Sequence, residues 1–176
     1  MGSSARNRNA TAFTVATPAP SVAPILCSRP HLEYFKREPI KNGEVFHEEL
    51  AVTRDEARTF AEQWAADWNE MAVERVLAHF DDQVLFTSPT ALAVVGVATV
   101  CGKEALRQYW NAAVAQVRSL RFTVDRVVWD ADTRELAIIY DAEIDGRTRR
   151  VSENLTFGAD GHVISAEVFH GVFGKT

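Results

Sequence analysis

An α+β domain is predicted by the order in which two kinds of periodicity follow one another along the chain. Residues 53–117 place apolar side chains mostly at helical spacing, whereas residues 120–169 alternate apolar and polar side chains as strands do. Short turns separate the later runs, at Ala131-Asp132, Asp145-Gly146 and Asp160-Gly161. Helices that are segregated from an antiparallel meander are typical of the α+β class.

Three helices are predicted in the first part of the domain. The first begins at a capping box, in which Thr53 is followed three residues later by Glu56, and apolar side chains then recur at helical spacing. The other two are Met71–Phe80, which Asp81-Asp82 would end, and Lys103–Val117.

Between the second and third helices the sequence predicts a short strand and a long loop. The strand is Val84–Thr87, stopped by Pro89. The loop, Thr90–Cys101, is apolar, rich in β-branched residues and contains Gly96. A connection of this length is more typical of a lid or a contact surface than of a simple link.

Four strands are predicted to complete the chain: Leu120–Trp129, Glu135–Ile144, Arg147–Phe157 and His162–Phe169 or slightly beyond. The first of them changes phase near Asp125-Arg126. A β-bulge at that point would curl the sheet.

The composition indicates one ordinary globular domain, with no excess of basic residues that would attract a polyanion. The 176 residues are 47% hydrophobic and carry a formal net charge of −5, so neither nucleic acid nor an anionic membrane is an expected partner. Cys27 and Cys101 form neither a disulfide framework nor a metal-ligand spacing. No Gly-rich phosphate loop, His-Glu metal spacing or activated nucleophile is visible, so no cofactor or metal is expected.

The N-terminal part differs from the rest. Residues 1–30 are rich in Ala, Ser, Thr and Pro and are predicted to be a disordered tail, residues 31–52 an arm, and residues 53–174 the folded domain. A cytoplasmic location is expected. The basic, Ser- and Ala-rich tail also has the composition of an organelle transit peptide, but its prolines disfavour the amphipathic helix that such a peptide needs.

Two ionisable side chains fall on an apolar face near the end of the chain. Read at period two, Glu153 shares a face with Val151, and His170 shares one with Val168. If Asp160-Gly161 is a two-residue turn, Glu153 pairs with Val168 and Val151 with His170. Glu153 and His170 are then diagonal neighbours, within mutual reach or one water apart.

Each candidate site residue also has a structural explanation. Glu153 could be functional, or it could form a buried ion pair with Arg149 or His170. Tyr140, which a two-residue turn would pair with Val151, could donate a proton or simply pack in the core. Ser88 could orient a ligand or cap the turn before Pro89. The aromatic candidates are core residues or pocket walls: Trp64, Trp68 and Tyr109.

The order of elements and a set of scattered residues over about 53–172 resemble the nuclear transport factor 2-like superfamily, and within it the SnoaL-like branch. The residues that carry this resemblance are Trp64, Asp67, Trp68-Asn69, Asp82, Phe86-Thr87-Ser88-Pro89, Gly102 and Phe157-Gly158-Ala159-Asp160-Gly161. The resemblance implies a cone of curled sheet closed by helices around a pocket, frequently in a dimer. Members include isomerases, cyclases, dehydratases, epoxide hydrolases and non-catalytic binding proteins.

The ketosteroid isomerases of this superfamily provide a residue-by-residue comparison. Their general base is an Asp just before the Pro that ends the first strand, where this chain has Ser88. Their Tyr donor corresponds to Trp64, their second carboxyl donor to Glu153, and a pocket Trp of some members to His170. Only Glu153 keeps the chemical group, so ketosteroid isomerase activity is not expected.

The resemblance leads to two hypotheses. The favoured one is a pocket protein that binds a small, largely apolar molecule between Trp64, Trp68, Tyr140, Val151 and Val168. The alternative is an enzyme that acts on a carbonyl or polyketide-like compound through Glu153 and His170, with Tyr140 or Ser88 orienting an oxygen. A homodimer is also expected, through an outer sheet face that carries Phe169, Trp129 and Val127.

Overall fold

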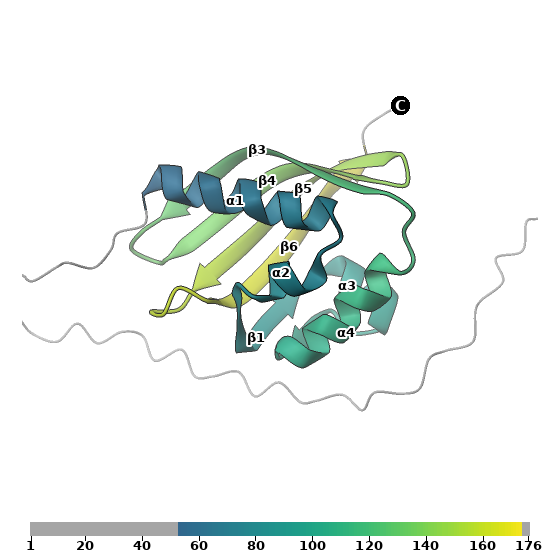
Figure 1. Cartoon of the computed structure of the whole chain (residues 1–176), viewed down its shortest axis with the longest axis horizontal. Helices are drawn as coiled ribbons and strands as arrows, with labels where there is room; N and C mark the ends of the chain where they lie inside the picture. The colour runs from purple at the N-terminus through teal and green to yellow at the C-terminus, as the bar shows by residue number, and fades with distance from the viewer. Residues whose placement is uncertain (1–52, 174–176) are drawn as a thin grey trace, which may run out of the picture. The chain divides into compact units, whose positions relative to one another are not determined.

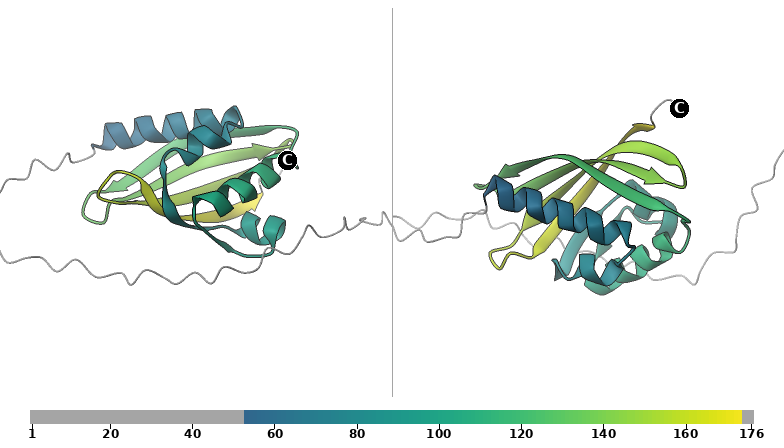
Figure 2. Two further views of the ribbon diagram at one scale, coloured as in Figure 1. Left: turned by 60° about the horizontal axis from the view of Figure 1, so that its bottom comes forward. Right: turned by 45° about the horizontal axis from the view of Figure 1, so that its top comes forward.

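A curled sheet with helices gathered on one side of it is seen in the computed structural model, which describes residues 53–173 (Figures 1 and 2). The α+β prediction is therefore confirmed. The predicted tail (1–30), the predicted arm (31–52) and Cys27 lie outside the described residues.

The described elements, in chain order, are α1 (Arg54–Asn69), α2 (Val73–Leu77), β1 (Phe80–Thr87), α3 (Pro89–Val95), β2 (Thr99–Cys101), α4 (Lys103–Val114), β3 (Leu120–Asp130), β4 (Glu135–Ile144), β5 (Arg147–Phe157) and β6 (Val163–Phe173). The strands form one sheet in the order β2-β1-β6-β5-β4-β3. β1 and β6 pair in parallel, and the other neighbours are antiparallel. None of the helices within residues 53–173 has the length and apolarity needed to cross a membrane.

The predicted capping box begins α1. The backbone N–H of Glu56 donates to Thr53 Oγ1 at 3.2 Å, and the backbone N–H of Thr53 donates to Glu56 Oε2 at 2.7 Å. At the other end of the helix, the amide of Asn69 bonds both the N–H and the carbonyl of Phe122 in β3, at 2.6 and 3.1 Å. These contacts fix α1 against the edge of the sheet.

The second predicted helix is too long. α2 ends at Leu77, and Phe80 and Asp81-Asp82, which were assigned to that helix and its end, belong to β1. Phe80 pairs with Val163 of β6, and the N–H of Val163 donates to the carbonyl of His79 at 2.8 Å. Pairing with a strand more than eighty residues away thus overrides the local helical pattern.

The predicted loop Thr90–Cys101 is wrong, because most of it is α3 and β2. Ser88 is the N-cap of α3 and accepts from the N–H of Thr90 at 3.1 Å, and Pro89 occupies the first turn. Gly96, with φ +80°, ends the helix in the left-handed conformation.

The meander β3–β6 confirms the predicted strands and most of their register. Asp145 and Gly146, with φ +50° and +77°, make a two-residue turn in which Ile144 pairs with Arg147. Tyr140 therefore pairs with Val151, as predicted.

The Asp160-Gly161 turn is not the expected two-residue turn. Phe157 pairs with Val163, and the chain between them forms a longer loop closed by the N–H of Gly158 donating to His162 O at 2.8 Å. Ile164 is the extra residue that restores the predicted register. Val151 therefore pairs with His170, and Glu153 with Val168, as expected from the sequence.

The predicted outer face is partly wrong. A bulge at Asp125 shifts the register of β3, which confirms the predicted phase change, but its effect is to keep Val127 and Trp129 on the inner side with Phe122. Val127 is 6% exposed, and the Trp129 ring lies 5.9 Å from that of Phe157.

Phe169 does lie on the outer face as expected, at 49% exposed, and the exposed apolar side chains there also include Val128, at 57%. The homodimer through this face stays a prediction that sedimentation at micromolar concentration tests, and a monomer would contradict it.

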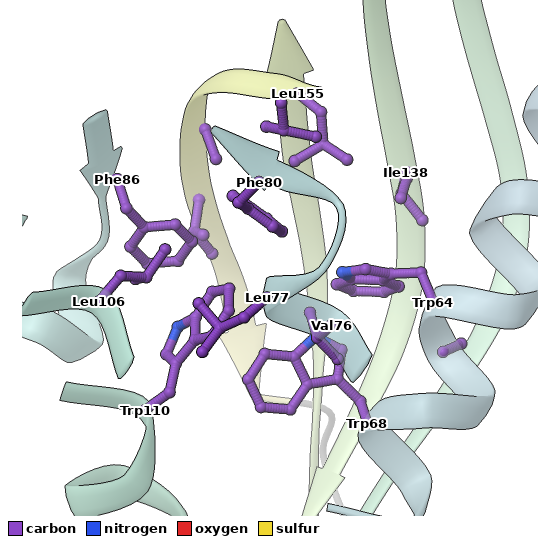
Figure 3. Packing of buried hydrophobic residues seen from close by; sticks show 14 of the residues in the cluster. Trp64, Trp68, Val76, Leu77, Phe80, Phe86, Leu106, Trp110, Ile138 and Leu155 are labelled. Carbon is purple, nitrogen blue, oxygen red and sulfur yellow. The ribbon is translucent and has the colours of Figure 1, made fainter. Parts of the chain in front are cut away.

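The core lies where the helices meet the inner face of the sheet. Figure 3 shows Trp64 and Trp68 of α1 and Trp110 of α4 converging on Phe80 and Leu77. The Trp68 and Trp110 rings meet edge to face at 4.9 Å, and Trp110 makes a similar contact with Phe80 at 5.2 Å. This cluster holds α1, α2 and α4 at fixed positions over the strands.

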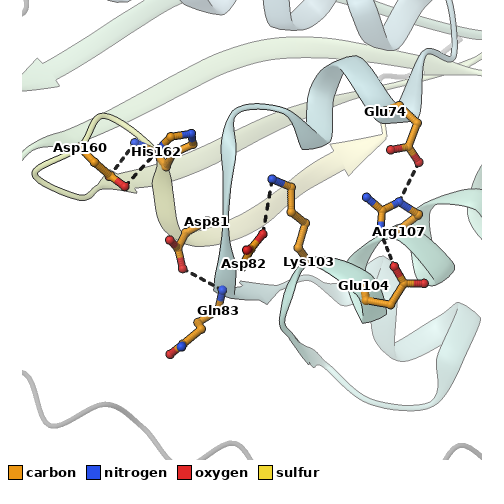
Figure 4. A network of polar contacts seen from close by, with 9 residues as sticks. All are labelled: Glu74, Asp81, Asp82, Gln83, Lys103, Glu104, Arg107, Asp160 and His162. Carbon is orange, nitrogen blue, oxygen red and sulfur yellow. Dashed lines mark hydrogen bonds and ion pairs between the residues drawn. The ribbon is translucent and has the colours of Figure 1, made fainter.

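Surface ion pairs connect the helices at one end of the domain (Figure 4). Arg107 of α4 reaches Glu74 of α2 at 2.8 Å and also contacts Glu104. Lys103 lies 3.7 Å from Asp82 of β1. Because the acids are largely exposed, each pair contributes about 1 kcal/mol or less to stability.

Replacing Thr53 by Ala removes the side-chain half of the capping box. We expect the free energy of unfolding to fall by about 1 kcal/mol, measured by urea denaturation. Thr59→Ala is the matched control, because Thr59 lies within the same helix and its hydroxyl donates to the carbonyl of Asp55. It should change stability by no more than about 0.5 kcal/mol. Equal losses for the two variants would contradict the capping assignment.

Candidate functional site

A cavity of about 820 Å³ lies between the inner face of the sheet and the helices α3 and α4. Its apolar wall includes Phe86 of β1, Val94 of α3, Ala113 of α4, Phe122 of β3 and Val151 of β5. Polar side chains from separate elements also line it, among them Ser88, Tyr109, Tyr140, Arg118, Asp145, Arg147, Arg149, Glu153 and His170.

Glu153 is the buried acid of this cavity. Its position on the inner face of β5, between Val151 and Leu155, leaves it 4% exposed. Burial removes the carboxylate from water and raises the pKa of Glu153 to about 8, and a hydrogen bond from Tyr140 lowers it only in part. Glu153 is therefore mostly protonated at neutral pH.

Tyr140 and Tyr109 are the two phenols of the site. The Tyr140 hydroxyl donates to Glu153 Oε2 at 3.3 Å. Burial and the neighbouring Glu153 raise the pKa of Tyr140 well above its ordinary value. Burial also raises the pKa of Tyr109 to about 12, against a hydrogen bond from Ser88 that lowers it. Both phenols therefore keep their protons at neutral pH.

His170 interacts with Arg149 and is not bonded to Glu153. Arg149 Nη1 donates to His170 Nδ1 at 2.5 Å, so Nδ1 is the unprotonated nitrogen of a neutral imidazole. Partial burial and the charge of Arg149 lower the pKa of His170. The predicted diagonal placement beside Glu153 is present, but among residues 53–173 no hydrogen bond joins the two side chains.

The structure brings almost all the predicted site residues to one cavity. Its lining includes Glu153, His170, Tyr140, Trp68, Ser88, Tyr109, Arg149, Val151 and Val168. Trp64 is the exception. It is fully buried behind Tyr140, with ring centroids 5.2 Å apart, and it stacks on Phe122 at 5.7 Å. Trp64 therefore supports the position of Tyr140 and does not line the cavity.

Sequence reasoning missed three parts of the site: the wall from α3, Arg147 and Arg118. Ala93 and Val94 form a wall because α3 exists, and the Ser88-Pro89 start and the Gly96 end of that helix were visible signals. Arg147 was also detectable, because it shares a period-two face with Arg149.

No such signal marked Arg118, because its place at the cavity depends on a contact with a distant turn. For a metal, residues 53–173 contain no group of three His, Cys, Asp or Glu side chains placed to hold an ion.

Comparison with known proteins identifies the family. Residues 61–168 match the family described as SnoaL-like domain. The chain belongs to this family. The comparison with curated proteins gave no match. The resemblance predicted from the sequence is therefore confirmed at the level of family and fold.

Solved structures share the fold of this SnoaL-like chain. A SnoaL-like protein of unknown function from Burkholderia thailandensis is 24% identical, with a TM-score of 0.62 over 69% of this chain and 99% of that one. A protein of unknown function from Methylobium petroleophilum is 21% identical, with a TM-score of 0.57 over 69% and 80%. The epoxide hydrolase/cyclase-like enzyme SalBIII is 18% identical, with a TM-score of 0.53 over 67% and 92%.

Glu153→Gln tests the buried acid through the pH dependence of stability. Between pH 4.5 and about 8 the folded protein keeps a proton that the unfolded chain has released, so the free energy of unfolding falls as pH rises. The slope is at most about 1.4 kcal/mol per pH unit. Gln removes this slope, so the variant should exceed the wild type in stability near pH 8, and the difference should shrink toward about pH 5.

The measurement is urea denaturation across this pH range. Glu143→Gln is the matched control, because Glu143 is exposed on β4 and should leave the slope unchanged. A wild-type slope that persists in Glu153→Gln would show that Glu153 is not the group that titrates.

Proposed function

We propose that the cavity binds a small, largely apolar molecule that carries one oxygen function, which reaches Glu153. The volume of about 820 Å³ falls within the range of small-molecule sites. Most of its lining is aromatic or aliphatic, whereas a few polar groups converge from different strands and helices. That combination is typical of a binding pocket.

The observation that carries the proposal is a protonated carboxyl held in an apolar wall. A neutral Glu153 has one O–H to donate, and its other oxygen already accepts from Tyr140. A ligand carbonyl or ether oxygen would satisfy that O–H without placing a charge in the cavity. Tyr109 of α4 and Ser88 at the start of α3 add two further hydroxyls to the lining of the cavity.

Filling the cavity should weaken the binding of an apolar fluorescent probe, N-phenylnaphthylamine. Ala113→Trp places an indole in the cavity, because Ala113 lines it on α4. Ala112→Trp is the matched control, because the neighbouring residue is exposed on the same helix. We expect Ala113→Trp to weaken binding at least about tenfold and Ala112→Trp to leave it unchanged. Equal binding by the two variants would show that the probe does not occupy this cavity.

A second candidate function is general acid catalysis by Glu153. A carboxyl with a pKa of about 8 is protonated at neutral pH and can transfer that proton to a leaving oxygen. The likeness in fold to SalBIII, an epoxide hydrolase/cyclase-like enzyme, makes epoxide opening a reasonable reaction to test. We assign no proton transfer to His170, because its Nδ1 already accepts a hydrogen bond from Arg149.

Styrene oxide and a β,γ-unsaturated ketosteroid separate the catalytic possibilities. A general acid should give styrene oxide hydrolysis that falls as pH rises through about 8 and is lost in Glu153→Gln. No ketosteroid isomerisation is expected, because a positioned base contributes a factor of about 10² to 10⁴ and Ser88 caps α3 instead. Hydrolysis that survives Glu153→Gln contradicts the first expectation, and isomerisation abolished by Ser88→Ala contradicts the second.

A further inference from the structure

Basic side chains gather at one end of the cavity. Arg118 comes from the segment between α4 and β3, Arg147 and Arg149 from β5, and His170 from β6. The whole chain has a formal net charge of −5, so this gathering does not follow from a basic composition.

The β4–β5 turn holds the cluster together. Asp145 Oδ1 accepts from the backbone N–H groups of Arg118 and Ser119, at 2.8 and 3.0 Å, and the N–H of Asp145 donates to Ser119 O at 3.0 Å. These bonds fasten Arg118 beside the turn from which Arg147 begins β5. Arg149 follows two residues later on the same face.

The charges at this end do not cancel among the described residues that line the cavity. The acids there are Asp145 and Glu153. Bonds from two backbone N–H groups lower the pKa of Asp145 and keep it charged, whereas burial keeps Glu153 mostly neutral. His170 is neutral beside Arg149. Arg118 and Arg147 therefore place two guanidinium groups beside one charged carboxylate, that of Asp145.

The positive end and the acid are separated along one strand. A strand advances about 3.3 Å per residue, so Glu153 lies about 13 Å from Arg149 along β5. On the inner face of β5, the side chain between them is the apolar and buried Val151. Arg147 is exposed at the rim, whereas Glu153 is buried deep in the cavity.

We propose that the ligand of this cavity is an apolar carboxylate, whose anionic end is held by Arg118, Arg147 and Arg149 while its apolar body extends toward Glu153. This proposal rests on the proposed binding function and adds the charge class of the ligand. Guanidinium groups bind carboxylates through two parallel N–H···O bonds, which suits a rim that has several of them. An apolar body without a charged end would leave the rim without a partner from the ligand.

The test compares a hydroxynaphthoate with its amide, which has nearly the same shape but no charge. Each compound is titrated against bound N-phenylnaphthylamine, and the displacement gives its Kd. We expect the full-length wild-type protein to prefer the carboxylate by at least about tenfold, and this preference to weaken in high salt.

The variants assign that preference to the rim. Arg118→Ala combined with Arg147→Ala should reduce the preference to within about twofold while leaving the Kd of the amide unchanged. Both residues are exposed, so their loss should not disturb folding. Arg147→Lys should keep part of the preference, and Arg126→Ala, an exposed arginine on the outer side of β3, should keep all of it.

The possible results separate this proposal from the function on which it rests. Equal affinity for carboxylate and amide, or a preference that survives the double variant, overturns the anionic ligand, while probe binding lost in Ala113→Trp would still support the pocket. Failure of N-phenylnaphthylamine to bind overturns both. A preference for the carboxylate that is present in the wild type and lost in the double variant supports both the pocket and the anionic ligand.

Discussion

The two-residue turn at Asp145 and Gly146 sets the geometry on which the site depends. Because both residues take left-handed φ values, the turn pairs Ile144 with Arg147 and fixes the register of β4 against β5. A shift of one residue would send every inner side chain of β5 to the outer face. The same Asp145 carboxylate also holds the start of β3 by accepting from two backbone N–H groups.

The buried Glu153 shows how packing and chemistry are linked in this fold. A carboxylate among Val151 and Leu155 is unfavourable, and the protein meets that cost by keeping the proton and by a hydrogen bond from Tyr140. Tyr140 is in turn positioned by its edge contact with Trp64. An acid near pKa 8 can serve as a hydrogen-bond donor or as a proton donor, so binding and catalysis share one structural basis.

Curvature and the short helix α3 decide the shape of the cavity. The extra residue Asp125 keeps Phe122 and Val127 on the same side of a curled strand, and α3 adds a wall in place of the expected loop. Neither feature supplies the chemistry. They determine instead that Glu153 and Tyr140 face a largely apolar cavity of about 820 Å³.

The sequence by itself determined the α+β class, the strands of the meander and the inward direction of Glu153 and His170, because period-two alternation and turn residues are local signals. Only the tertiary structure decided which side chains form hydrogen bonds with Glu153 and His170. Glu153 bonds Tyr140 and His170 bonds Arg149, and Arg118 reaches the cavity, because side-chain reach and the contacts of Asp145 depend on how distant segments pack. The same reason explains why Phe80 left its helical pattern to pair with Val163.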